Sequence, residues 1–264
     1  MPRPPRVYKS PAIVLRQRRL GETDKIITLY TAEYGKVDAV AKGVRRLKSR
    51  LAGNVEPLSH GSFLLARGRN LDIITQVQSI ESFQPLHDDL GRLSHALYAA
   101  ELLDRATEER SENFALYRLL LDTLRRLAER DDLERTLRYY EMSVLGQLGY
   151  RPELQRCVVC GTELASREVV RWAANLGGVV CPNCRPQNTV LSTLSHTTLH
   201  ALRVLQRENF QEVVDLDLDH DTAVALEHLL REAIHYALDQ DVRSAAFLDE
   251  VRKRPRIHRR AGIQ

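Results

Sequence analysis

The four cysteines of the chain fall together, in two short pairs that could hold a metal ion. Cys157 and Cys160 form one C-x2-C pair, Cys181 and Cys184 form a second, and twenty residues separate the pairs. Zinc takes four ligands near tetrahedral geometry, and two such turns brought together by a β-excursion supply them. The spacing therefore predicts one structural zinc ion bound by these four residues.

Three other uses of the cysteines fit the sequence less well. Disulfides need an oxidising compartment, and the sequence shows no export signal. A redox C-x-x-C pair usually stands alone near a βαβ unit, and unligated buried cysteines would not need this spacing. A catalytic zinc keeps a position open for water, and the deaminase signature needs H-x-E and a proline where Val180 precedes Cys181. We expect the zinc to stabilise the fold.

The second feature of the sequence that could do chemistry is a run of positively charged residues. The stretch AKGVRRLKSR, residues 41–50, holds five cations and no acid, although the whole chain carries a formal net charge of only +4. Residues 1–84 contain 15 Lys and Arg against 7 Asp and Glu, residues 85–250 contain 18 against 28, and residues 251–264 contain six against none. A charge run is usually a solvated face, but this partition favours a polyanion as partner of the basic segments.

The predicted DNA-binding residues come from this run and from neighbouring strand ends and turns. They are Arg16, Arg18, Arg19, Lys36, Lys42, Arg45, Arg46, Lys48, Arg50, Arg67 and Arg69. Base stacking should be minor, because the same region offers few aromatic side chains: Tyr8, Tyr30, Tyr34 and Phe63. No Walker A, G-x-S-x-G or G-x-G-x-x-G motif occurs, so we expect a binding protein with no small-molecule substrate and no enzymatic activity.

The segments that carry these cations have the sequence pattern of short β-strands. Residues 7–16, 25–31, 36–43, 62–67 and 71–80 have β-branched or alternating apolar patterns, and residues 17–24 read as a turn. The long segment between the third and fourth strands has room for a short helix. Five strands with a helical insertion after the third outline an OB-fold barrel, although an SH3-like barrel also fits the pattern.

After Pro85 the apolar spacing becomes helical. Amphipathic helices are predicted at 90–106, 113–130, 133–149, near 193–208 and near 221–240, the last with Asp221 as its N-cap. The fold class is therefore α+β and multidomain. We expect an OB-fold DNA-binding domain at 1–84, an α-helical domain at 85–250 with the zinc-finger insertion at about 155–190, and a basic disordered tail at 251–264.

Membrane segments are not expected. No run of about 18 apolar residues occurs, and the N-terminal MPRPPRVYKSP lacks the apolar stretch of a secretory signal. A cytoplasmic location is the default expectation, and membranes are not expected as partners.

One long stretch resembles a known family. GETDKIITLYTAEYGKVDAVAKGVRRLKSRLAG, residues 21–53, is similar to the RecO family of bacterial recombination-mediator proteins, and AKGVRRLKSRLAG is typical of it. YAAEL at 98–102 and the paired C-x2-C motifs occur in the same order, and the four cysteines match the family's metal positions one for one. The resemblance covers essentially the whole chain apart from the basic tail.

The resemblance implies an N-terminal OB-fold and a helical domain that carries a zinc finger. It implies binding of single- and double-stranded DNA at the nucleoid, annealing of complementary strands, and help in loading the RecA recombinase onto DNA coated by single-stranded-DNA-binding protein. RecR and the acidic tail of the coating protein are the implied partners.

Two other classes of function remain open on the residues alone. A zinc-containing OB-fold adaptor would prefer RNA or one defined sequence. A zinc-dependent nucleic-acid hydrolase would need a cluster of acids in a cleft.

Overall fold

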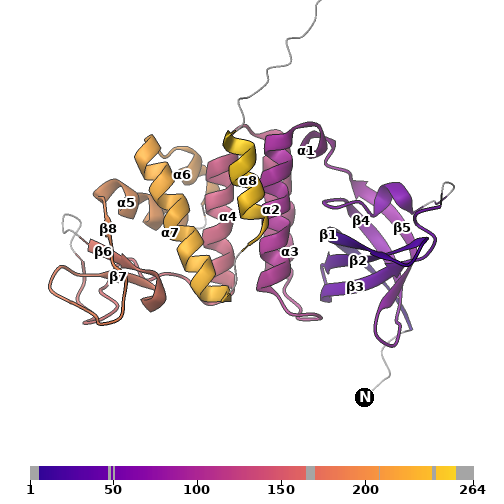
Figure 1. Ribbon diagram of the computed structural model, residues 1–264, viewed down its shortest axis with the longest axis horizontal. Coiled ribbons are helices and arrows are strands. Elements are labelled where there is room, and N and C mark those ends of the chain that lie inside the picture. Colours follow the sequence, from indigo (N-terminus) through magenta and orange to yellow (C-terminus); the bar gives the residue numbers. More distant parts are fainter. Residues whose placement is uncertain are drawn as a thin grey trace, which may run out of the picture.

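The computed structural model describes residues 6–46, 49, 51–164, 170–207, 209–239 and 242–253. A barrel lies at one end, a block of helices in the middle, and a small three-stranded sheet at the other end (Figure 1). Two of the predicted DNA-binding residues, Lys48 and Arg50, lie outside the described residues, and so does the predicted tail from residue 254 onward.

The barrel is built from the first five strands. They are β1 (Val7–Leu20), β2 (Asp24–Thr31), β3 (Gly35–Ala41), β4 (His60–Ala66) and β5 (Asp72–Glu81), with the 3-10 turn η1 (Ala52–Asn54) between β3 and β4. The barrel closes in the order β1-β2-β3-β5-β4, with β3 and β5 parallel and the other pairs antiparallel. This is an OB-like arrangement, so the predicted barrel is confirmed.

Alternation along the strands fills the barrel. Inward positions supply its core, which comprises Tyr8, Ala12, Val14, Ile27, Leu29, Ala39, Ala41, Phe63, Leu65 and Ile74, together with Val44 and Val55 from the β3–β4 segment. The predicted turn at 17–24 was too long. Gln17 to Leu20 continue to pair with β2, so β1 ends at Leu20 and only residues 21–23 turn.

The helices follow directly after the barrel. They are α1 (Gln84–Asp88), α2 (Leu90–Ala106), α3 (Phe114–Glu129), α4 (Leu133–Gln147), α5 (His196–Leu205), α6 (Phe210–Val214), α7 (His220–Leu238) and α8 (Ser244–Lys253). Between α4 and α5 lie β6 (Val170–Ala173), η2 (Ala174–Leu176), β7 (Gly178–Val180) and β8 (Ser192–Leu194), with β6 as the central strand. None of the described helices is both long and apolar enough to cross a bilayer.

The sequence missed three helices and misplaced one cap. α1 and α6 have only five residues each, too few to show a helical period. α8 ends at Lys253, so residues 251–253 are helical, whereas the prediction assigned them to the tail. The N-cap of α7 is Asp219, which accepts the Thr222 N–H at 2.7 Å, and Asp221 lies inside the first turn.

Ion pairs hold α8 against the other helices. Arg231 of α7 forms two hydrogen bonds to Asp249, at 2.9 and 2.6 Å, and Arg252 pairs with Glu227 at 2.6 Å. At the other end of α8, the Glu101 carboxylate accepts the backbone N–H groups of residues 243 and 244 at 3.0 and 2.7 Å. The glutamate of the YAAEL stretch therefore caps a helix that lies about 140 residues further along the chain.

The barrel and the helices share one apolar core. Ile13, Leu15 and Tyr30 point outward from β1 and β2 and belong to the buried cluster of the helical block. A polar link adds to it: the His60 Nε2 atom lies 2.8 Å from the Tyr117 hydroxyl. These contacts fix one outer face of the barrel against the helices.

Gly35, the first residue of β3, lies where the barrel approaches the α2–α3 loop of the helical block. Its φ is +62°, and a Cβ added there would lie 2.0 Å from the backbone oxygen of Ser111 in the α2–α3 loop. Gly35→Ala should lower the free energy of unfolding by about 2 kcal/mol or more, from backbone strain and the clash together. Urea unfolding followed by circular dichroism measures it.

Gly146 in α4 is the matched control, since a Cβ there meets no atom within 4 Å. Gly146→Ala should leave stability equal or raise it by up to about 1 kcal/mol. Equal stabilities of Gly35→Ala and the parent would show that the barrel and the α2–α3 loop do not pack closely at Gly35.

Candidate nucleic-acid interface and metal centre

The described part of the basic run forms an exposed loop at the end of β3. Val44 is 2% exposed and closes the barrel core, whereas Lys42, Arg45 and Arg46 on either side of it are exposed to solvent. One buried valine thus anchors the loop and turns three cations outward.

The β1–β2 turn holds this loop in place. The Asp24 Oδ1 atom accepts the Gly43 N–H at 2.7 Å, and the Thr23 carbonyl accepts the Arg45 N–H at 3.0 Å. The Gly43 N–H and then the Thr23 hydroxyl favour the charged carboxylate, so the pKa of Asp24 is lowered. Sequence reasoning treated GETD as an ordinary turn. The only available signal in the sequence was the short acidic side chain of Asp24 at the end of this stretch.

Strand pairing brings another cation to the same end of the barrel. Arg19 pairs with Lys25 across β1 and β2, and Lys25 pairs with Ala41, the residue before Lys42. Lys25 itself bonds to Gln17 at 2.6 Å and to Glu56 at 3.3 Å. We call Arg19, Lys42, Arg45 and Arg46 the exposed basic cluster.

Three other predicted cations are partnered by carboxylates. Arg16 and Lys36 both pair with Asp104 of α2, at 2.5 and 3.3 Å, in the contact between barrel and helices. Arg18 pairs with Asp38 at 3.1 Å. Two carboxylates offset part of the charge of these three cations, so any DNA contact they make starts from a weaker local potential.

Arg67 and Arg69 lie in the β4–β5 turn, at the other end of the barrel. The Arg67 guanidinium stacks over the rings of Tyr8 and Tyr34, with 5.0 and 5.8 Å to the ring centroids, and Arg69 is exposed. Three of the four aromatic candidates for stacking are buried: Tyr8 is 5% exposed, and Tyr30 and Phe63 are 0% exposed. The predicted site residues therefore divide between the two ends of the barrel.

The four cysteines meet at one point beyond the helices. Their sulfur atoms all lie within 4.8 Å of one another, and the Cys160 and Cys181 sulfurs are 3.8 Å apart. Four thiolates at a Zn–S distance of about 2.3 Å stand about 3.8 Å apart, whereas a disulfide needs about 2.05 Å. The donor set and spacing fit a closed tetrahedral site.

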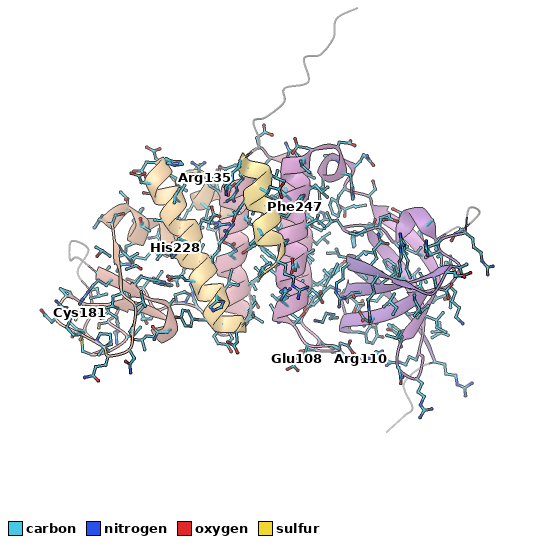
Figure 2. All side chains as sticks on the ribbon, in the orientation of Figure 1. Glu108, Arg110, Arg135, Cys181, His228 and Phe247 are labelled. Carbon is cyan, nitrogen blue, oxygen red and sulfur yellow. The ribbon has the colours of Figure 1, made fainter. Side chains whose placement is uncertain are left out.

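Backbone donors favour the thiolate form of Cys157. The Cys181 N–H points at the Cys157 sulfur at 3.3 Å. Burial opposes ionisation of Cys157, but the N–H groups of Cys181, Cys160 and Val159 outweigh it, and its pKa falls to about 6. The thiolate is the metal-binding form. Figure 2 shows Cys181 at the opposite end of the molecule from the barrel.

The fold and these two sites define a class: an OB-like barrel with an exposed basic cluster, joined to a helical block that carries a four-cysteine centre. Comparison with known proteins gives the family. Residues 6–83 match the family described as "Recombination protein O N terminal", and residues 87–246 match "Recombination protein O C terminal". The chain belongs to the RecO family of DNA repair proteins.

Several curated relatives carry the name "DNA repair protein RecO". The protein of Roseiflexus sp. (strain RS-1) is 39% identical over 258 residues, which cover 98% of this chain and 90% of the relative. That of Pelotomaculum thermopropionicum is 38% identical over 250 residues, 95% of this chain and 96% of the relative. That of Dehalococcoides mccartyi (strain CBDB1) is 34% identical over 249 residues, with 94% and 97% covered.

The cysteine centre gives a direct prediction. The purified protein should contain one zinc ion per chain, and Cys157→Ser should release it, because a hydroxyl replaces one thiolate. The melting temperature should fall by about 5 °C or more, which corresponds to about 2 kcal/mol in a chain of this size. Elemental analysis and thermal unfolding measure both effects.

Val159→Ser is the matched control, because Val159 lies in the same turn, is 47% exposed and offers no ligand. It should retain zinc and melt near the parent. A parent protein purified without metal, and unchanged by added zinc, would contradict the assignment.

Proposed function

We propose that this chain binds single- and double-stranded DNA through its barrel and anneals complementary strands. With RecR, it helps load the RecA recombinase onto DNA coated by single-stranded-DNA-binding protein, on the nucleoid in the cytoplasm. Family membership supports the link to DNA repair. The exposed basic cluster is the observation that carries DNA binding.

The physical basis of the proposal is neutralisation of phosphates. Cations of the cluster replace condensed counterions, whose release drives binding at low salt. Two DNA strands repel one another, and a protein surface that lowers their charge lets complementary bases meet. Because the aromatic rings of the barrel are mostly buried, binding should show little sequence preference and a strong dependence on salt.

A groove on the helical block suits the acidic tail of the coating protein. It has a volume of about 300 Å³ and is lined by apolar side chains of α3 and α4, among them Leu119, Tyr139 and Met142. Arg118 and Arg151 also line it. An acidic peptide in this groove would bring its carboxylates near the two guanidinium groups.

We assign the metal a structural role and propose no chemical step. Four thiolates would complete the coordination shell of zinc and leave no position for water or substrate. An adaptor specific for RNA is the remaining rival, and competition between single-stranded DNA and RNA of the same sequence separates the two. The proposed function requires DNA to compete at least as well as RNA.

Charge removal at the cluster tests the DNA interface. Replacing Lys42 and Arg46 together by alanine should weaken binding of single-stranded DNA by about tenfold at physiological salt. The slope of log K against log salt should fall by about 0.7 for each lost phosphate contact. Fluorescence anisotropy over a salt series measures both quantities.

A charge-matched control separates a local site from the global charge. Arg156, beside the first cysteine pair, and Arg207, after α5, are exposed, lie outside the barrel and pair with Glu163 and Glu212. Their double alanine variant also removes two positive charges and should bind DNA nearly as the parent does. Equal losses in the two variants would count against a DNA site on the barrel.

The groove yields its own test. Arg118→Glu should weaken binding of a peptide copied from the acidic end of the coating protein by about tenfold or more, because charge reversal replaces attraction by repulsion. DNA binding should be unchanged. Arg207→Glu is the control, and an unaltered peptide affinity in Arg118→Glu would rule out this groove.

A further inference from the structure

Arg171 makes a contact that the four-cysteine motif does not predict. One terminal nitrogen of its guanidinium, Nη2, donates to the backbone oxygens of Cys181 at 2.8 Å, Pro182 at 3.2 Å and Cys184 at 2.7 Å. These three carbonyls belong to the second C-x2-C turn. The Arg185 guanidinium also donates to the Pro182 and Cys184 oxygens, the latter at 3.0 Å, whereas Arg171 reaches all three carbonyls of the turn that carries two of the four sulfurs.

The two cysteine turns are closed in different ways. The first closes through its own backbone: the Gly161 N–H donates to the Cys157 oxygen at 2.8 Å, and the Cys157 N–H donates to the Thr162 oxygen at 2.9 Å. The second has one long backbone bond, from the Cys184 N–H to the Cys181 oxygen at 3.4 Å, and Pro182 has no N–H to give. Arg171, together with Arg185, supplies side-chain donors to this turn, and only the Arg171 contacts include the Cys181 oxygen among these bonds.

The position of Arg171 is fixed by the sheet. It lies on β6, the central strand, where it pairs with Val180 of β7 on one side and Thr193 of β8 on the other. Its neighbours Val170 and Trp172 are each 1% exposed, so the strand is anchored in the core. Val180 directly precedes Cys181, which places the guanidinium beside the turn.

The charge of Arg171 also matters. Four thiolates and one divalent cation sum to −2, and carbonyl dipoles that converge on one point repel one another. A fixed guanidinium compensates both. Hydrogen-bonded groups just outside the ligand shell orient the ligands, and their loss typically lowers metal affinity about 10- to 100-fold.

We propose that Arg171 is the positioning residue of the metal centre: it holds the Cys181–Cys184 turn in its metal-binding shape and so sets how long the ion is retained. The inference rests on the assignment of these cysteines as zinc ligands. It concerns retention of the metal, and the ligand set stays complete without Arg171.

The test compares zinc release from three purified full-length variants with that of the parent. Zinc-loaded parent, Arg171→Gln, Arg171→Lys and Arg156→Gln are mixed with a chromogenic chelator, and the absorbance is followed. Arg171→Gln should release zinc about tenfold faster or more. Arg171→Lys should lie closer to the parent, because an ammonium group keeps the charge and three donors.

Arg156→Gln is the control, since it removes one arginine from the same module at an exposed pair with Glu163. It should release zinc as the parent does. Cobalt substitution adds a readout that a loss of folding would change: Arg171→Gln should keep the absorption spectrum of tetrahedral cobalt bound by four thiolates, because all four ligands remain.

Release from Arg171→Gln at the parent's rate, or equal acceleration in Arg156→Gln, would overturn the proposal. If Arg171→Gln does not fold, Arg171→Lys decides: release a few-fold faster than from the parent supports the role, because an ammonium group replaces the guanidinium only in part, and release at the parent's rate contradicts it. If the parent protein binds no zinc, the metal assignment is wrong and this inference is wrong with it. A zinc-bound parent with an unaffected Arg171→Gln refutes this inference alone.

Discussion

The outer face of β1 and β2 has to be buried, and much of the molecule follows from that constraint. Ile13, Leu15 and Tyr30 point away from the barrel interior, where they would meet water if the barrel stood alone. The helical block covers them and makes one continuous core with them. The barrel therefore cannot use this face for a ligand, although in an OB-like fold a strand face is the usual binding surface.

The same contact sorts the cations of the barrel. Arg16 and Lys36 lie close enough to the helices for Asp104 to pair with both. Residues further from the contact keep their charge exposed, and the Asp24 hydrogen bond to Gly43 holds them in one loop. The exposed basic cluster thus lies at the end of the barrel that carries the β1–β2 turn, and Arg67 and Arg69 lie at the other end. The cysteine centre lies beyond the helices, and Cys157 and Cys181 belong to the same apolar core as the helical block.

Local patterns predicted the parts of this structure that depend on local physics. Alternating residues indicated the strands, and helical spacing indicated α2, α3, α4, α5 and α7. The C-x2-C spacing predicted that the sulfurs of Cys157, Cys160, Cys181 and Cys184 would lie together. The failures involve partners distant in sequence. Asp104 lies 88 residues from Arg16, and Glu101 lies 143 residues from the N–H that it accepts at Ser244. Arg171 looked like any strand arginine, because its three acceptors are backbone atoms without a sequence signature.

The central claim is that DNA lies on the exposed basic cluster and not on the cations that the helices already compensate. Lysine acetylation with and without single-stranded DNA tests it most directly, because Lys42 is an exposed lysine of the cluster. DNA should protect Lys42 from the reagent, and protection should disappear at high salt. Lys42 that stays fully reactive in the DNA complex would contradict the account.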